Sequence, residues 1–289
     1  MASSPLPGMR LLRRRSEPGR LVLGAQAAGS VRVEGEDRGT RLSGAERVAV
    51  VAHWDRGNRV GPSTVALLRA LSSAGFESLL VSTAPGAGSL DWVGGRPRDL
   101  TVLRRPNLGY DFGSWATALD RYPDISSSPS VLFFNDSLVG PFVSIDHLLQ
   151  QFEQSDADVW CMTDTYEIQH HLQSYCLGFR DGCLQAPPLQ RFWREIREEP
   201  TREEVIEQYE IGLGLLLGRE GFTAEAAIPS RRVVEDGGNP TIGGWRRLLW
   251  EGVPFVKRQL LREPGLVPDG RMVRGELLRR YSVDVDWWL

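Results

Sequence analysis

Polar side chains that can hold a ligand directly follow three of the chain's apolar runs. The first set follows residues 100–103, in a turn where Gly109 lets the backbone approach a ligand closely. The second and third follow runs that end at Asp136 and Asp164, so two successive predicted strands each deliver a carboxylate. Because the carboxyl ends of parallel strands meet at one edge of an open α/β sheet, where ligands bind, the three stretches predict a common binding edge.

Each of these stretches taken alone also fits a structural role. Asn107 and Gly109 suit any tight turn, with no ligand nearby. Asp111, at a predicted helix start, can cap free backbone amides, and Asn135-Asp136 suits an Asx turn. Their recurrence at one predicted sheet edge favours the ligand-binding interpretation.

A fourth polar stretch has the two-residue period of a β-strand. His171, Gln173 and Tyr175 alternate with Leu172 and Ser174, so their side chains are expected on one face. Such a face can hydrogen-bond a ligand rich in hydroxyl groups. Zinc binding by the adjacent histidines at 170 and 171 is disfavoured, because neighbouring strand residues point to opposite faces.

An alternation of strands and helices is expected to position these side chains. Residues 47–54 form a continuous apolar run, which is typical of a strand buried on both faces. The fold class predicted by the alternation is α/β, with a mostly parallel, Rossmann-like sheet flanked by helices. The expected elements are strands at 47–54, 77–83, 100–103, 130–137, 158–164 and 223–228, and helices at 63–71, 114–119, 144–152 and 189–197.

The second half of the chain is predicted to be more helical. Thr201 and Glu204 have the spacing of a capping box that opens a further helix. Glu210 follows at the end of that helix, where a solvated glutamate without a special role is the alternative interpretation.

Composition restricts the class of protein and its partners. The chain has 289 residues, of which 41% are hydrophobic and 25% charged, as in globular proteins. A net charge of −3 gives no field that would attract nucleic acid. Three cysteines without metal-ligand spacing favour a reduced, cytoplasmic compartment. We find no apolar run near the roughly 20 residues that a membrane-spanning helix needs.

The amino-terminal part differs in composition from the rest. Residues 1–45 are rich in Gly, Ser, Arg and Pro, which predicts a disordered leader with a short strand pair at 21–23 and 31–33. Residues 46–289 are expected to form a single domain with a helical carboxyl-terminal extension. The basic residues at 13–15 fit either a solvated tail or contact with anionic lipid.

Taken together, the chain resembles the rhamnan synthesis protein F family and, more broadly, glycosyltransferases of the GT-A type. The resemblance covers about residues 46–262. The stretches that carry it are residues 107–115, 135–141, 171–175, 209–213 and 254–257.

This resemblance implies a cytoplasmic enzyme that works at the inner face of the plasma membrane, with peripheral membrane contact left open. Its reaction would move a sugar, such as rhamnose or another deoxyhexose, from a nucleotide-sugar donor to a growing surface polysaccharide or glycolipid, with inversion. The resemblance implies that Glu210 is the catalytic base, with Asp164 as the competing candidate. A non-catalytic nucleotide- or sugar-binding module of the same fold is the alternative. A hydrolase is disfavoured, because the chain has no Gly-x-Ser-x-Gly elbow.

The resemblance also implies roles for the remaining polar residues. Asp136 is the expected ligand of Mg²⁺ or Mn²⁺, although Asn135-Asp136-Ser137 has one carboxylate where the Asp-x-Asp motif has two. Without a metal, arginines such as those at 56, 104 or 105 would have to neutralise the phosphates. The expected donor-binding residues are His53, Asn107, Gly109, Asp111, Asn135 and Asp136, and the expected sugar- or acceptor-binding residues are His171, Gln173, Tyr175 and Lys257.

Overall fold

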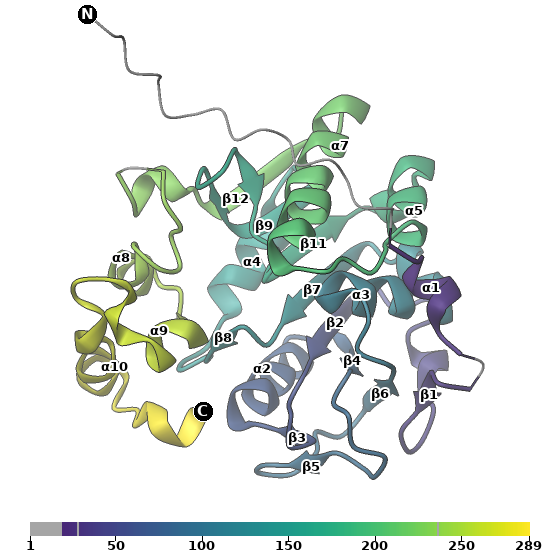
Figure 1. Ribbon diagram of the computed structural model, residues 1–289, viewed down its shortest axis with the longest axis horizontal. Coiled ribbons are helices and arrows are strands. Elements are labelled where there is room, and N and C mark those ends of the chain that lie inside the picture. Colours follow the sequence, from purple (N-terminus) through teal and green to yellow (C-terminus); the bar gives the residue numbers. More distant parts are fainter. Residues whose placement is uncertain (1–18, 28, 236) are drawn as a thin grey trace, which may run out of the picture.

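A nine-stranded sheet forms the middle layer of the protein, and helices pack against both of its faces (Figure 1). The computed structural model describes residues 19–27, 29–235 and 237–289. The strands follow the order β1-β6-β4-β2-β7-β11-β9-β10, and β12 also pairs with β9. The bounds of these strands are Arg32–Val33 (β1), Arg47–His53 (β2), Glu77–Ser82 (β4), Leu100–Arg104 (β6), Ser130–Asn135 (β7), Val159–Thr165 (β9), His171–Leu172 (β10), Cys176–Arg180 (β11) and Ala224–Ile228 (β12).

Most strands of the sheet point in the same direction. Strands β6, β4, β2 and β7 are parallel neighbours. Strand β11 is antiparallel to both β7 and β9, so β9 and its parallel neighbour β12 share the direction of β2. Only the short edge strands β1 and β10 and the inserted strand β11 run the other way within the described sheet. The predicted mostly parallel α/β fold is confirmed.

The apolar run of β2 explains its central position. Val48 and Val50 contribute to the hydrophobic cluster on one face of the sheet, whereas Ala49 and Val51 contribute to the cluster on the other. All four side chains are buried. A strand that is covered on both faces needs apolar residues at successive positions, which is the pattern seen in the sequence.

Helices divide between the two faces of the sheet. Helices α1, α3, α5 and α7 contribute to the cluster that includes Val50, and helices α2, α4 and α8 contribute to the cluster that includes Val51. A third cluster joins α8, α9 and α10 at the carboxyl-terminal end. The bounds of the helices are Val22–Ala25 (α1), Pro62–Ser73 (α2), Tyr110–Arg121 (α3), Asp146–Gln154 (α4), Pro187–Arg194 (α5), Arg202–Val205 (α6), Gly212–Glu220 (α7), Trp245–Trp250 (α8), Arg258–Arg262 (α9) and Val273–Tyr281 (α10).

Two short strand pairs attach loops and the carboxyl-terminal helices to the sheet. Strand β8 (Leu138–Val139) follows β7 and pairs with β13 (Val256–Lys257), which leads directly into α9. Strand β3 (Arg59–Val60) pairs with β5 (Asp91–Trp92). The β8–β13 pair therefore brings Lys257 next to the end of β7.

The order of strands creates a switch point beside β2. The chain proceeds from β2 outward to β4 and β6, then returns to β7 on the opposite side of β2. Loops that leave β2 and β7 therefore diverge at their carboxyl ends, and a crevice opens between them. This is the position where open α/β sheets bind ligands.

The described part of the leader differs from the expectation of disorder. Residues 1–18 lie outside the described residues, but residues 19–45 contain α1 and β1. Val22, expected on a strand, lies on α1 and is buried in the main core, as is Leu42. Residues 31–33 were expected to pair with residues 21–23, but β1 pairs with β6. Composition alone did not reveal these packing partners.

Two further expectations about local structure need correction. His171 and Leu172 form β10, but the strand stops there, and residues 173–175 form a turn before β11. The helix expected from residue 114 begins at Tyr110. The capping box of Thr201 and Glu204 is confirmed. Within the described residues, none of the helices is long and apolar enough to cross a bilayer.

Candidate functional site

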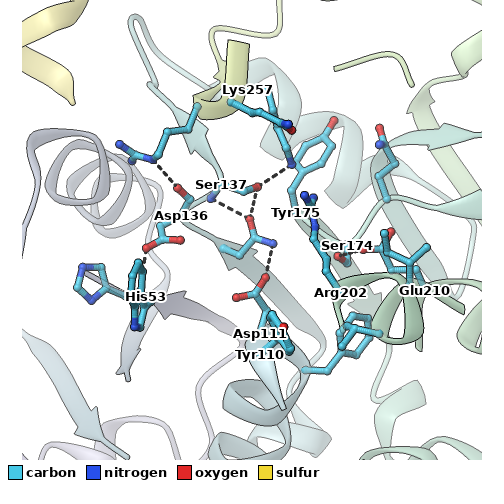
Figure 2. A pocket seen from close by; sticks show the side chains of 18 of the residues that line it. His53, Tyr110, Asp111, Asp136, Ser137, Ser174, Tyr175, Arg202, Glu210 and Lys257 are labelled. Atoms are coloured by element: carbon cyan, nitrogen blue, oxygen red, sulfur yellow. Dashed lines mark hydrogen bonds between the residues drawn. The ribbon is translucent and has the colours of Figure 1, made fainter. Parts of the chain in front are cut away.

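A cavity of about 530 Å³ opens at the carboxyl ends of β2 and β7, where the strand order switches. Its volume lies within the range typical of small-molecule sites. Side chains from the sheet, from α3, from the helical segment after residue 201 and from β13 converge on it (Figure 2). The predicted site residues in its wall are His53, Asp111, Asn135, Asp136, His171, Gln173, Tyr175, Glu210 and Lys257.

A chain of hydrogen bonds crosses the floor of this cavity (Figure 2). The Lys257 Nζ donates to Ser137 Oγ at 3.0 Å, and Ser137 Oγ donates to Asn135 Oδ1 at 2.6 Å. Asn135 Nδ2 in turn donates to Asp111 Oδ2 at 2.8 Å. Each hydrogen bond is donated in the direction from Lys257 to Asp111, so the Ser137 hydroxyl on one side and the Asp111 carboxyl group on the other fix the amide orientation of Asn135. We call these four residues the Lys257–Asp111 chain.

Asp111 has an unusual environment for a carboxyl group. It is the second residue of α3 and accepts from Asn135, whereas the sequence suggested that it caps helix amides. Burial, followed by the negative charge of Asp136, raises the pKa of Asp111 to about 7. The hydrogen bond from Asn135 and the charge of Lys257 oppose this shift only in part. Near neutral pH, the proton of Asp111 is therefore bound or released easily.

Asp136 is held by the backbone of the loop after β2. Its Oδ2 accepts the backbone N–H of Trp54 at 2.9 Å, and its carbonyl oxygen accepts Arg258 Nε at 3.2 Å. Asp136 and Asp111 lie close enough for the charge of one to act on the other. Although the sequence motif has one carboxylate, the fold supplies a second from α3.

These two carboxylates can be tested against the needs of a divalent cation. The described residues contain no group of three or more His, Cys, Asp or Glu side chains able to hold a metal. Magnesium, however, keeps several waters and is commonly held by one or two carboxylates together with substrate phosphates. Burial first and the charge of Asp136 second raise the pKa of Asp111, and a cation between the two carboxylates would offset both effects. The donor set therefore fits a cation completed by ligand oxygens.

Positive side chains gather on the side of the cavity formed by β13 and α9. Lys257 is the only lysine of the chain, while every other basic residue among its 34 is arginine. Burial lowers the pKa of Lys257 to about 8. Its Nζ lies 5.8 Å from the centre of the Tyr175 ring. Burial also lowers the pKa of Arg258.

Glu210 is oriented by two neighbours, His171 from β10 and Ser174 from the turn that follows it. Ser174 Oγ donates to Glu210 Oε1 at 2.8 Å, and His171 Nε2 lies 3.5 Å from Glu210 Oε2. Burial lowers the pKa of His171, but the hydrogen bond to Glu210, the Gln169 carbonyl and nearby charges together raise it above its ordinary value. His171 Nδ1 lies 2.9 Å from the Gln169 carbonyl oxygen, which leaves Nε2 directed to Glu210.

A π-helical segment places Glu210 in the cavity. Residues 202–220 form one continuous helix, in which the π-helix η4 (Ile206–Ile211) separates α6 from α7. A π-helical turn accommodates an additional residue and is often found at functional sites. Val205, Ile206 and Glu210 all line the cavity, so the irregular segment faces it directly. The sequence did not reveal this irregularity.

His53, Gln173 and Tyr175 line the cavity with polar atoms that already have partners. His53 Nδ1 lies 3.0 Å from Ser82 Oγ and its Nε2 lies 3.1 Å from the Arg59 carbonyl. Burial lowers the pKa of His53 despite the nearby charge of Asp136. Thr163 Oγ1 lies 2.6 Å from both Gln173 Oε1 and the Tyr175 hydroxyl. Because their polar atoms are engaged within the protein, these side chains mainly determine the shape of the cavity wall.

Three predicted site residues lie outside the cavity wall. Asn107 is exposed, and a Cβ added to Gly109 would lie 2.5 Å from Val22 Cγ2. The glycine thus permits close packing against α1, where the sequence suggested close approach to a ligand. Asp164 is buried, accepts the Ser230 backbone N–H at 2.6 Å and lies 2.9 Å from His170 Nε2, in a structural position at the end of β9.

The arginines expected near the phosphates also lie elsewhere. Arg104 is buried in an ion pair with Glu34 at 2.6 Å, and Arg105 donates to Ser114 Oγ at 3.1 Å. Arg56 is exposed and does not line the cavity. The basic residues of the wall are Arg59, Arg202, Lys257, Arg258 and Arg262.

Sequence reasoning missed several residues of the wall. Ser174 lies between two predicted residues, and its hydroxyl could have been considered as a partner of Glu210. Arg258 directly follows Lys257, which was a usable signal. Arg202 follows Thr201 of the capping box, and Tyr110 precedes Asp111. Whether the side chains of Arg202 and Tyr110 point into the cavity depends on the fold.

Comparisons with solved structures give low similarity scores. A glycosyltransferase involved in the glycosylation of the major capsid of the virus PBCV-1 has a TM-score of 0.38 at 11% identity, covering 76% of this chain and 98% of that one. The apo-form glycosyltransferase GlyE of Streptococcus pneumoniae has a TM-score of 0.32 at 11% identity, covering 62% and 45%. At these scores neither likeness carries an argument about activity.

Curated relatives are more informative. The virulence protein VirA of Vibrio anguillarum is 26% identical over 193 residues, which cover 56% of this chain and 62% of VirA. The uncharacterized protein y4gN of Sinorhizobium fredii is 28% identical over 117 residues, covering 39% of this chain and 30% of y4gN. The aligned region thus spans less than two thirds of the length of either relative.

The family model described as rhamnan synthesis protein F matches residues 99–276. This range extends over more than half of the chain and contains α3, the end of β7, Glu210 and Lys257. The chain therefore belongs to the rhamnan synthesis protein F family.

Proposed function

We propose that the protein is a glycosyltransferase that uses a nucleotide-sugar donor. The observation that carries this proposal is the convergence of Asp111, Asp136, Glu210 and Lys257 on one cavity at the switch point of the sheet. A diphosphate leaving group needs positive charge, and the transfer needs a base for the acceptor hydroxyl. Membership of the rhamnan synthesis protein F family supports the same class of reaction.

In the proposed reaction, the acceptor hydroxyl oxygen attacks the anomeric carbon of the donor sugar. The bond between that carbon and the diphosphate oxygen breaks, and the diphosphate leaves with the bonding electrons. Glu210 accepts the proton of the hydroxyl, and attack from the face opposite the leaving group inverts the anomeric centre. Ser174 and His171 hold the carboxylate in one orientation, which leaves little reorganisation for the transition state.

The leaving group would be stabilised on the other side of the cavity. Lys257 and Arg258 are the proposed partners of the diphosphate, because both line the cavity beside Asp136. Asp111 and Asp136 would hold Mg²⁺ or Mn²⁺, and the cation would neutralise charge that develops on the phosphate oxygens. Rhamnose is the first donor sugar to test, because it gives the family its name. The acceptor would be a glycan or a lipid-linked glycan.

A non-catalytic binding module is the second candidate. Both carboxylate oxygens of Glu210 already have partners, Ser174 and His171, an arrangement that would also suit a purely structural carboxylate. The two candidates differ in turnover. A binding module would bind a nucleotide but would release no nucleoside diphosphate from a nucleotide sugar.

The deciding experiment measures nucleoside diphosphate release from UDP-, GDP- and dTDP-sugars, with and without a rhamnan-derived acceptor. We expect release with one donor, and a loss of about 100-fold or more in Glu210→Gln. The matched control is Glu207→Gln, an exposed residue one turn earlier in the same helical segment, which should retain activity. Nucleotide binding without release in the wild type would support the binding module, and neither binding nor release would refute both.

A further inference from the structure

Tyr110 combines a bulky side chain with a left-handed backbone conformation. Its φ is 51°, and the preceding Gly109 has a φ of 69°. Left-handed backbone places Cβ close to the following carbonyl, so bulky residues adopt it rarely. Glycine would fit this position without strain.

Other residues in this conformation are of types that tolerate it. Among the described residues, every other non-glycine residue with positive φ has a small polar side chain. Asn and Asp in particular visit this region because their side chains can hydrogen-bond locally. Tyr110 is the only bulky one within the described part of the chain. These other residues are Asn58, Asp99, Asp181 and Ser282.

Core packing does not explain the position of the Tyr110 ring. It is 45% exposed, lines the cavity and belongs to none of the three core clusters. Within the described residues, no aromatic or cation contact of this ring and no hydrogen bond of its hydroxyl is present. Figure 2 shows Tyr110 beside Asp111, at the end of the Lys257–Asp111 chain remote from Lys257. The strain therefore holds an unpartnered aromatic ring at the wall.

We propose that the Tyr110 ring is the stacking platform for the nucleobase of the donor. This inference rests on the proposed function and adds the subsite that it lacks. The proposed diphosphate site extends from Lys257 to the cation held by Asp111 and Asp136. Tyr110 lies at the Asp111 end of this site, where an adjoining part of the donor would lie, and a flat aromatic ring matches the face of a base. Stacking accepts any base, so Tyr110 provides affinity and other groups select the base.

The test compares three variants of Tyr110 by titration calorimetry and thermal denaturation. Tyr110→Ala removes the ring and keeps the strain, Tyr110→Gly removes both, and Tyr110→Phe keeps the ring. The probes are UDP, GDP and dTDP, inorganic pyrophosphate, which has no base, and rhamnose 1-phosphate, which has a sugar but no base.

We expect the Ala and Gly variants to weaken binding of the preferred nucleoside diphosphate about tenfold, within the range for base stacking. Binding of pyrophosphate and of rhamnose 1-phosphate should not change, and Tyr110→Phe should bind the nucleotide within about twofold of wild type. The Gly variant should melt about 2–4 °C above the Ala variant, because it relieves the strain. Asp181→Ala and Asp181→Gly are the matched controls, since Asp181 also has a φ of 51° and lies outside the cavity. They should leave every affinity unchanged.

Three results would overturn the stacking role alone: unchanged nucleotide affinity in Tyr110→Ala, an equal loss for pyrophosphate or rhamnose 1-phosphate, or an equal loss in Tyr110→Phe. A wild-type protein that binds no nucleoside diphosphate would overturn both this inference and the proposed function. The two failures are therefore distinguishable in one set of titrations.

Discussion

Replacement of Asp111 by asparagine should stabilise the protein at alkaline pH while it impairs the proposed reaction. Asparagine has nearly the same shape and can still accept the hydrogen bond from Asn135 Nδ2. It removes the negative charge that burial and Asp136 make unfavourable. At alkaline pH the wild-type protein thus carries, at its cavity, a negative charge on Asp111 that destabilises the folded state.

The expected size of the effect follows from the pKa of Asp111, which is about 7 in the folded protein against an ordinary value of 3.8. The folded state binds this proton more tightly than the unfolded state does. The free energy of unfolding therefore falls as pH rises from about 3.8 to about 7, and at higher pH the full destabilisation by this group remains but no longer changes with pH. A difference of roughly three pKa units sets an upper limit of about 4 kcal/mol. Since Asp111 is only partly buried, we expect about 1–2 kcal/mol for Asp111→Asn at pH 8.

Thermal denaturation in the presence of EDTA measures this difference. At pH 8, Asp111→Asn should melt roughly 2–8 °C above wild type, and the gain should shrink to near zero at about pH 4. The control is Asp120→Asn, an exposed residue of the same helix, which should change the melting temperature little at either pH. A lower melting temperature for Asp111→Asn at pH 8, or a gain that is independent of pH, would refute the reasoning. When the denaturation is repeated without EDTA, Mn²⁺ should raise the melting temperature of wild type more than that of the variant.

The remaining predictions concern two other positions, Lys257 and Gly109. Turnover should decline as pH rises through about 8, because Lys257, whose pKa is lowered to about 8, loses the charge that stabilises the leaving group; a pH–rate profile that stays flat to pH 9.5 would contradict this role. Lys257→Arg should lower kcat at least tenfold, because the planar guanidinium cannot replace a compact ammonium between Ser137 and the Tyr175 ring. Gly109→Ala should destabilise the protein by about 1–3 kcal/mol in urea denaturation through its positive φ and its contact with Val22, and the dissociation constant for nucleotide should not change.

The parts of the fold that could be predicted from sequence are those encoded by local pattern. The continuous apolar run of β2 identifies a strand covered on both faces, and the polar residues after β7 lie where the strand ends. Order along the chain then places Asp111 and Asp136 at the same sheet edge, as the structure has them.

Other features depend on contacts between distant residues and could not be predicted in this way. Asp164 follows a strand just as Asp136 does, but the Ser230 backbone amide and His170 engage its carboxylate away from the cavity. Arg104 looked available for phosphates, yet its partner is Glu34, from a segment expected to be disordered. The second carboxylate near Asp136 comes from α3, so inspection of the local motif alone suggested a poorer cation site than the fold supplies.

The π-helical segment η4 has a consequence for insertions and deletions in this family. A π turn behaves as an α-helix with one inserted residue, so deletion of one residue between 206 and 209 would restore regular winding. Val205 and Glu210 are five residues apart, a separation that the wider π winding places on nearly the same face. After the deletion they would be four residues apart in an α-helix and would still share a face. Homologues that lack the additional residue but retain the glutamate should therefore keep it on the cavity side of the helix.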